Sequence, residues 1–183
     1  MLAPPPGVVS IWIRPRNCPG FSMVDLLVVL GMVGVLAGVA APLMSGAFRR
    51  SVSMGAGRHI AGQIRSARLA AVTANRPMRV RFNCPAAGQY RVLEVTGDGA
   101  IDNDANRCSY PYPDTDPNAA PNLDGPIMYL PDGITFSATQ DLQISTAGLI
   151  TPMTGGTPAQ IGVTDGLFAR QLTVSTAGRI QGP

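Results

Sequence analysis

The longest apolar run in the chain covers residues 21–44 and contains a single charged residue, Asp25. A helix rises about 1.5 Å per residue, so this run is long enough to cross the roughly 30 Å hydrocarbon core of a bilayer. A carboxylate inside lipid is costly without a partner, which makes Asp25 a candidate functional residue. The pattern therefore predicts a membrane-spanning helix with an acid near its start.

The stretch that follows, residues 45–76, contains no proline and is rich in alanine and arginine. At 100° per residue, one face of a helix collects Ile60, Ile64, Ala67 and Ala71, and the opposite face collects Arg58, Arg65 and Arg76, with Arg68 close by. The pattern predicts that the helix continues as an amphipathic helix over 45–76, ending at Pro77. Its arginine face is either solvated or packed against neighbouring molecules, or it contacts nucleic acid.

Beyond Pro77 the hydrophobic period changes from helical to two, which is typical of half-buried strands. Residues 78–83 alternate apolar and polar, 85–88 form a predicted turn, and 89–96 form the partner strand. Further predicted strands are residues 127–130, 134–137, 142–145, 160–164 and 171–175. The predicted fold class is α+β, with the long N-terminal helix packed on an antiparallel, β-rich, sandwich-like domain over 77–183.

Residues 1–20 precede the apolar run and carry Arg14 and Arg16. Basic residues flanking a span stay in the cytoplasm, so the remainder of the chain is expected across the membrane. An ordinary single-span anchor or an uncleaved secretory signal is the alternative. A secretory signal places its apolar segment before the cleavage site, whereas here the apolar run follows Gly20. Residues 1–20 are therefore interpreted as a leader.

The junction between leader and helix reads Gly20-Phe21-Ser22-Met23-Val24-Asp25-Leu26-Leu27-Val28-Val29-Leu30. It resembles the N-terminus of the type IV pilin and pseudopilin superfamily. The resemblance implies that a prepilin peptidase cuts between Gly20 and Phe21 and methylates the new N-terminal Phe21. It also implies that Asp25, where the family usually has Glu, meets the free N-terminus of a neighbouring subunit during assembly. Pro42 matches a proline common in pilin helices.

Two further segments resemble the GspH/FimT branch of that superfamily. They are Ser66-Ala67-Arg68-Leu69-Ala70-Ala71-Val72 with Asn75-Arg76-Pro77-Met78-Arg79-Val80, and the ending Leu172-Thr173-Val174-Ser175-Thr176-Ala177-Gly178-Arg179-Ile180. The branch implies a minor pseudopilin of a type II secretion system that takes part in protein secretion. Its expected partners are the prepilin peptidase, the inner membrane and other pilin or pseudopilin subunits, the latter through the N-terminal helix. The globular domain is expected on the periplasmic side, within a filament.

The alternative function is that of a FimT-like minor type IV pilin that binds DNA for uptake. FimT-like proteins are associated with a C-terminal Gly-Arg-any-Arg motif, and here the segment reads Gly178-Arg179-Ile180-Gln181. The second arginine is missing, which leaves Arg179, with Arg170, as candidate phosphate contacts. DNA binding is therefore the less favoured interpretation.

Composition adds little support for nucleic acid or for catalysis. The 183-residue chain has no lysine, and its net charge of +3 falls to +1 without residues 1–20, with 12 arginines against 11 acids. One histidine, His59, and one glutamate, Glu94, leave little for acid–base chemistry, and no phosphate loop or nucleophile motif is present. The protein is predicted not to be an enzyme.

The last candidates lie near the aperiodic loop predicted at residues 97–126. Outside the leader the cysteines are Cys84 and Cys108, which form either a disulfide or two free thiols, with the disulfide favoured in an extracytoplasmic domain. Asp98, Asp102 and Asp104 are close in sequence, so the loop is either a calcium site or a solvated acidic loop. Their spacing departs from the EF-hand pattern, which favours the solvated loop, and no other cofactor is expected.

Overall fold

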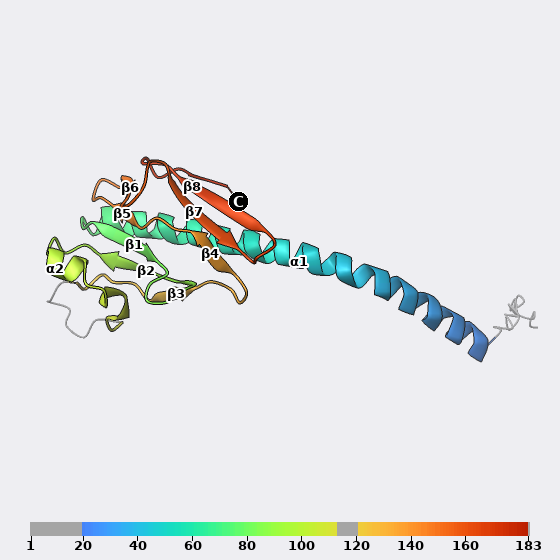
Figure 1. Ribbon diagram of the computed structural model, residues 1–183. Coiled ribbons are helices and arrows are strands. Elements are labelled where there is room, and N and C mark those ends of the chain that lie inside the picture. The colour runs from blue at the N-terminus through green and yellow to red at the C-terminus, as the bar shows by residue number, and fades with distance from the viewer. Residues whose placement is uncertain (1–19, 113–120, 183) are drawn as a thin grey trace, which may run out of the picture. The chain divides into compact units, whose positions relative to one another are not determined.

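The computed structural model describes residues 20–112 and 121–182, apart from the side chains of residues 41–43. Helix α1 covers Met23–Thr73 (Figure 1). The chain divides into two compact units, Met1–Leu43 and Met44–Pro183, and α1 contributes to both. The first unit contains the apolar part of α1. The second unit contains the amphipathic part of α1 and every strand of the described chain.

The second unit contains two antiparallel sheets. One sheet has five strands in the order β3-β2-β1-β5-β6, and the other has four strands in the order β4-β7-β8-β9. The strands are β1 Met78–Phe82, β2 Gln89–Glu94, β3 Ile127–Tyr129, β4 Thr135–Ala138, β5 Leu142–Ile144, β6 Ile150–Pro152, β7 Ala159–Thr164, β8 Ala169–Val174 and β9 Ile180–Gln181. Strands that are neighbours in sequence mostly pair with each other. The pairing of β1 with β5 joins the two parts of the five-stranded sheet.

One hydrophobic core joins the amphipathic part of α1 to both sheets, which Figure 1 shows lying against the helix. The predicted apolar stripe of Ile60, Ile64, Ala67 and Ala71 is buried in this core. The sheets contribute side chains such as Val80, Leu142, Ile161 and Leu172, all of them fully buried. Burying an aliphatic side chain stabilises the fold by about 1.5–3 kcal/mol, so this contact holds the helix on the domain. The predicted α+β fold class is confirmed.

The C-terminal end of α1 is formed by a Schellman motif. Asn75 adopts a left-handed conformation with φ of 51°, the Asn75 N–H donates to the Val72 carbonyl, and the Arg76 N–H donates to the Ala71 carbonyl at 3.1 Å. These two bonds satisfy carbonyls that the last helical turn leaves free. Regular helix therefore ends at Thr73, three residues before residue 76, the end predicted from the sequence.

Two short strands, β6 and β9, were missed by the sequence analysis. Each follows a turn with the same sequence, Ser-Thr-Ala-Gly, at residues 145–148 and 175–178. In both turns the serine carbonyl accepts from the glycine N–H at 2.8 Å, and the glycine φ is positive, 76° at Gly148 and 81° at Gly178. Strands of three and two residues are too short to show a period, but the repeated tetrapeptide was a usable signal.

The side chain of Arg68 lies against both Ser-Thr-Ala-Gly turns. Its Nε donates to the Gly148 carbonyl at 2.8 Å, and a Cβ at Gly178 would lie 2.8 Å from Arg68 Nη1. The second turn also contacts the start of β6 directly, because the Ile150 N–H donates to the Thr176 carbonyl at 2.8 Å. The sequence placed Arg68 near the solvent-facing arginines, but it is half-buried and ties the two sheets to α1.

Candidate functional site

The N-terminal end of α1 carries the candidate processing site. Gly20, Phe21 and Ser22 precede the helix and are exposed, so the Gly20–Phe21 peptide bond lies outside regular structure. The Ser22 hydroxyl oxygen accepts from the Val24 N–H at 3.3 Å, and Asp25 Oδ2 accepts from the Ser22 N–H at 3.3 Å. This arrangement resembles a capping box, with the acid satisfying a free N–H of the helix start. Asp25 thus already has one partner within its own chain.

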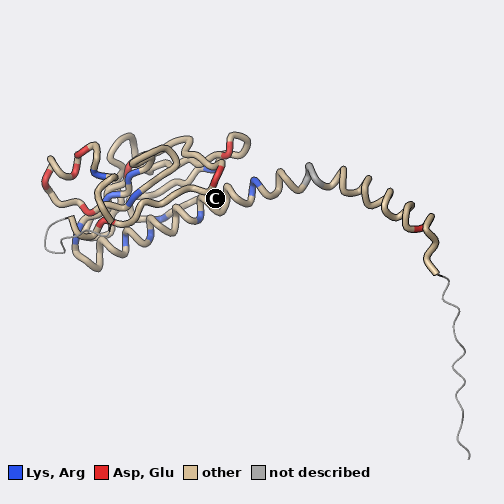
Figure 2. Tube along the Cα trace, turned by 90° about the horizontal axis from the view of Figure 1, so that it is seen from below, with Lys and Arg blue, Asp and Glu red and all other residues tan. Residues whose placement is uncertain are grey.

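The apolar part of α1 has no cover within its own unit. Met23–Ala40 has a mean hydropathy of 2.4, and none of it is buried among the described residues. Asp25 is the only charged residue in residues 20–43, and Figure 2 shows the charges concentrated in the second unit. Such a surface requires lipid or other apolar helices around it. The side chain of Pro42 lies outside the described part of the structure, so its match to the pilin helix proline stays a prediction.

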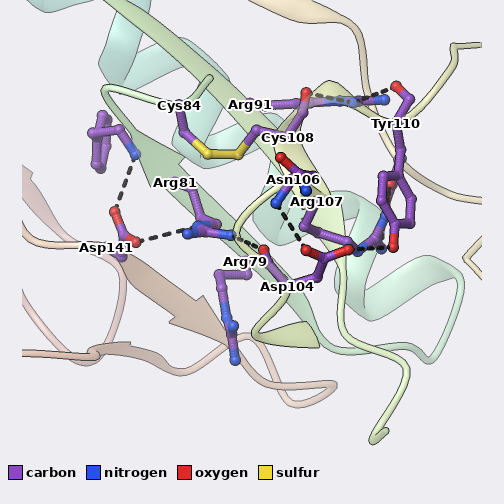
Figure 3. The surroundings of a disulfide bond; sticks show 12 residues. Arg79, Arg81, Cys84, Arg91, Asp104, Asn106, Arg107, Cys108, Tyr110 and Asp141 are labelled. Atoms are coloured by element: carbon purple, nitrogen blue, oxygen red, sulfur yellow. Dashed lines mark hydrogen bonds and ion pairs between the residues drawn. A yellow bond between two sulfur atoms is a disulfide. The ribbon is translucent and has the colours of Figure 1, made fainter. Parts of the chain in front are cut away.

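A cluster of buried arginines holds the described parts of the segment after β2, residues 97–112 and 121–126, over the outer face of the five-stranded sheet (Figure 3). Arg91 on β2 is fully buried, and burial lowers the pKa of its guanidinium. It donates to the carbonyls of Gly125 at 2.7 Å, Cys108 at 2.8 Å and Tyr110 at 2.7 Å. From β1, Arg79 donates to the Asp102 carbonyl at 2.8 Å. The sequence analysis missed this role of the strand arginines.

Arg107 is the arginine that the segment itself contributes to this cluster. Its side chain is 1% exposed and forms an ion pair with Asp124, whose side chain is 5% exposed. It also donates to the Glu94 carbonyl at 3.0 Å and lies over the Tyr110 ring at 5.1 Å from the centroid. Arg107 belongs to a single helical turn, η1 (Arg107–Ser109), and a second turn, α2, covers Gly99–Asp102. Within its described residues, the loop predicted as aperiodic therefore contains two helical turns and is attached to the sheet by these bonds.

A disulfide between Cys84 and Cys108 fastens the same segment covalently, with the two Cα atoms 5.6 Å apart (Figure 3). Both cysteines are buried and pack with Leu93, which lies on the same outer face of the sheet. The bond spans 24 residues and joins the end of β1 to the segment. A covalent bond and the arginine cluster thus act together at one place.

The three acids of the predicted calcium site do not gather around a common point. Asp98 accepts from the Ala100 N–H and caps α2, whereas Asp104 accepts from the Asn106 N–H at 2.9 Å and the Tyr110 hydroxyl at 2.8 Å. Asp102 is buried and accepts from Thr96 and from the Gly97 N–H at 2.9 Å. In the described part of the chain, no group of three His, Cys, Asp or Glu could hold a metal ion. The three carboxylates instead accept hydrogen bonds from nearby groups of their own chain, between Thr96 and Tyr110.

The two candidate DNA-contacting arginines lie apart from each other. Arg179 follows the second Ser-Thr-Ala-Gly turn, and its N–H donates to the Ser175 hydroxyl at 3.0 Å. Arg170 lies towards the other end of β8, five residues before Ser175, which is about 17 Å along an extended strand. Neither side chain bonds to any residue that the structure describes. The fold therefore does not assemble them into one contact site.

Comparison with known proteins gives three findings. Residues 56–178 match the family described as "Type II transport protein GspH". The pilin-like protein PilA1 of Thermus thermophilus is 35% identical over 88 residues, which are 48% of this chain and 51% of that protein. The chain therefore spans about half the length of this curated relative.

Among solved structures, the type IV minor pilin FimU of Pseudomonas aeruginosa (strain PAO1) is similar in two crystal forms. The first has a TM-score of 0.46 at 19% identity, over 73% of this chain and 90% of FimU. The second has a TM-score of 0.44 at 18% identity, over 70% and 90%. With a family match over about two-thirds of its length and an uncovered N-terminal apolar helix, the chain belongs to the GspH family, within the type IV pilin and pseudopilin superfamily.

Proposed function

We propose that the protein is a minor subunit of a type II secretion pseudopilus, made as a prepilin and cleaved between Gly20 and Phe21. Phe21 is then methylated, and the chain waits in the inner membrane with its β-rich domain on the periplasmic side before it enters a filament. One observation carries this proposal: an exposed Gly-Phe bond directly precedes a capped and uncovered apolar helix, which continues into a GspH-family domain.

The helix supports an assembly mechanism in which its apolar surface passes from lipid to neighbouring helices. Both environments are apolar, so the transfer requires little change in hydrophobic burial. Asp25 then fixes the position of one subunit's helix along the helix of its neighbour. A carboxylate has two oxygens, and only Oδ2 accepts the Ser22 N–H, so Oδ1 is available for the terminal ammonium of a neighbouring Phe21. A buried acid or ammonium alone costs several kcal/mol, which makes the pairing specific.

The processing step is tested by co-expressing the full chain with a prepilin peptidase and measuring the mass of the product. We expect loss of residues 1–20 and addition of one methyl group at Phe21. A Gly20→Trp chain, with a bulky residue at the cut, is the matched control and should keep its leader. An uncut wild-type chain would contradict the proposal.

The assembly step is tested with Asp25→Ala and the charge-retaining Asp25→Glu. Both variants should insert into the membrane, because removing or lengthening the acid leaves the apolar run intact. Only Asp25→Glu should be recovered in sheared filaments together with the other subunits. Normal incorporation of Asp25→Ala would refute the pairing role of this carboxylate.

The alternative function, DNA capture by a FimT-like minor pilin, draws support from Arg179, which is exposed at a tight turn and has no side-chain bond to the described residues. It is tested by titrating the full chain in detergent with duplex DNA at several salt concentrations. Binding that weakens with salt and with Arg179→Ala would favour DNA uptake, because phosphate contacts release counterions. Absence of binding at low salt would leave secretion as the function.

A further inference from the structure

An exposed apolar patch lies at the end of the second unit where its part of α1 begins. We use the term patch for three exposed apolar side chains on the two sides of one groove, Phe48 on α1 and Leu167 and Phe168 in the turn between β7 and β8. Phe48 and Leu167 are each 72% exposed, and Phe168 is 36% exposed. Phe48 and Arg49 line a groove of about 330 Å³ together with Asp165, the residue at the start of that turn. The fold thus brings together two segments more than a hundred residues apart.

The β7–β8 turn is held in one shape by Asp165. Its Oδ1 accepts the N–H groups of Leu167 at 2.9 Å and Phe168 at 2.6 Å, and the Gly166 N–H donates to the Thr164 hydroxyl at 3.0 Å. These bonds, with the nearby Arg49 guanidinium, lower the pKa of Asp165. The turn is therefore ordered, and it exposes the apolar side chains of Leu167 and Phe168 at the surface. A hairpin tip exposed to water does not need such side chains.

Chain connectivity places Phe48 close to the apolar run. The run ends at Met44, and Phe48 is four residues later in α1, which is about 6 Å along a helix. Each interfacial layer of a bilayer is roughly 5–8 Å thick beyond the hydrocarbon core. When residues 21–44 span the membrane, Phe48 is therefore at headgroup level.

The charges around the patch suit a lipid surface. Arg49 and Arg50 follow Phe48 directly and can contact lipid phosphates. Two acids, Asp132 and Asp165, also line the groove. Asp165 Oδ1 accepts the turn's own N–H groups, and its Oδ2 is buried without a hydrogen-bond partner among the described residues. Apolar side chains bordered by arginine are the composition of surfaces that lie in the membrane interface.

We propose that the β7–β8 turn and Phe48 form a membrane-docking surface, which inserts Leu167 and Phe168 into the lipid interface while the subunit waits in the bilayer. This inference rests on the proposed function, because it requires residues 21–44 to span that bilayer. Docking would fix the orientation of the β-rich domain relative to the membrane plane before assembly. The surface would be released when the helix leaves the lipid.

The test places a single tryptophan at the turn of the full chain. Trp12 in the leader is the only tryptophan of the sequence, so Trp12→Phe provides a background without one. Leu167→Trp reports on the patch, and Phe168→Trp is a second reporter if the first fails to fold. The matched control is Leu149→Trp, an exposed residue next to Gly148, which lies by Arg68 and Val72, about 30 Å along α1 from Arg49.

Each variant is reconstituted into phosphatidylcholine–phosphatidylglycerol vesicles with and without bromine on the acyl chains. We expect a blue-shifted emission at position 167 that brominated lipid quenches, and an unshifted, unquenched emission at position 149. Equal quenching at the two positions, or none at either, would overturn the inference. Vesicle flotation is measured on the same samples: a chain that floats without quenching refutes docking alone, whereas a chain that does not float refutes the membrane span.

Discussion

Replacing Arg68 by alanine should destabilise the domain far more than replacing Arg65, its neighbour one turn earlier in α1. Arg68 Nε donates to the Gly148 carbonyl at 2.8 Å, and the guanidinium also packs on Gly178. A hydrogen bond to a charged group contributes about 1.5–3 kcal/mol, and the buried Gly148 backbone would lose its partner. The expected loss is about 2–3 kcal/mol of unfolding free energy, or roughly 6–12 °C in Tm for a domain of this size.

The measurement is thermal unfolding of the full chain in detergent, followed by near-UV circular dichroism. This signal reports the packed aromatic cluster of Phe82, Tyr90 and Phe136 in the second unit, rather than the apolar helix. The matched control is Arg65→Ala, which removes an exposed arginine and should change stability by less than about 0.5 kcal/mol. Equal Tm losses for the two variants would refute the role given to Arg68.

A double-mutant cycle with Gly178→Ala sharpens this prediction. The added Cβ would lie 2.8 Å from Arg68 Nη1, and Gly178 has a φ of 81° that side chains rarely adopt. Strain at the backbone remains whatever occupies position 68, but the contact with the guanidinium disappears in Arg68→Ala. Gly178→Ala should therefore cost less in the Arg68→Ala background than in the wild type. Strict additivity would show that the two residues do not interact.

Three further predictions concern the segment from residue 97 to 126. Arg107→Met should lower the unfolding free energy, measured in urea, by about 3–5 kcal/mol, because it leaves Asp124 buried without its ion-pair partner. Adding Asp124→Leu should recover part of this loss. No recovery would argue against an electrostatic origin. The double variant Cys84→Ser and Cys108→Ser should have an unfolding free energy about 3 kcal/mol lower, as expected for opening a loop of this length. An unchanged unfolding free energy would contradict a stabilising disulfide. Burial alone would raise the pKa of Asp102, but the hydrogen bonds from Thr96 and Gly97 outweigh it and lower that pKa. The stability that Asp102 contributes should be complete above its unfolded-state pKa of about 3.9, and it should be lost as pH falls through the lower folded-state pKa. Asp102→Asn should therefore show a smaller fall of Tm below about pH 4 than the wild type. Parallel Tm curves for the two proteins would refute this.

Much of the fold could be predicted because burial has a local period in the chain. The stripe from Ile60 to Ala71 repeats every three or four residues, and the strand from Met78 to Phe82 alternates. Both signals depend only on residue type and spacing, and both identify the side that faces the core. The apolar run from 21 to 44 is equally local, which explains why its extent and its single acid are visible without any structure.

The attachment of the segment over the outer sheet face could not be predicted in the same way. Arg91 and Arg79 donate to backbone carbonyls, which every residue possesses, so no residue type marks their partners. The alternation in β1 predicted that Arg79 faces solvent, yet the segment covers it and leaves it 9% exposed. Only the pairing of Cys84 with Cys108 carried a sequence signal for this contact.

The sequence by itself determined the class of protein: an apolar helix with one acid after a Gly-Phe junction, an amphipathic continuation and a β-rich domain. Tertiary structure alone determined where the arginines act, since Arg68, Arg91 and Arg107 look in sequence like any surface cation. It also determined that Phe48 and Asp165, at the start of the β7–β8 turn, line one groove. The physical reason is that periodic burial is set by neighbours in sequence. Contacts to carbonyls and between distant turns exist only once the chain has folded.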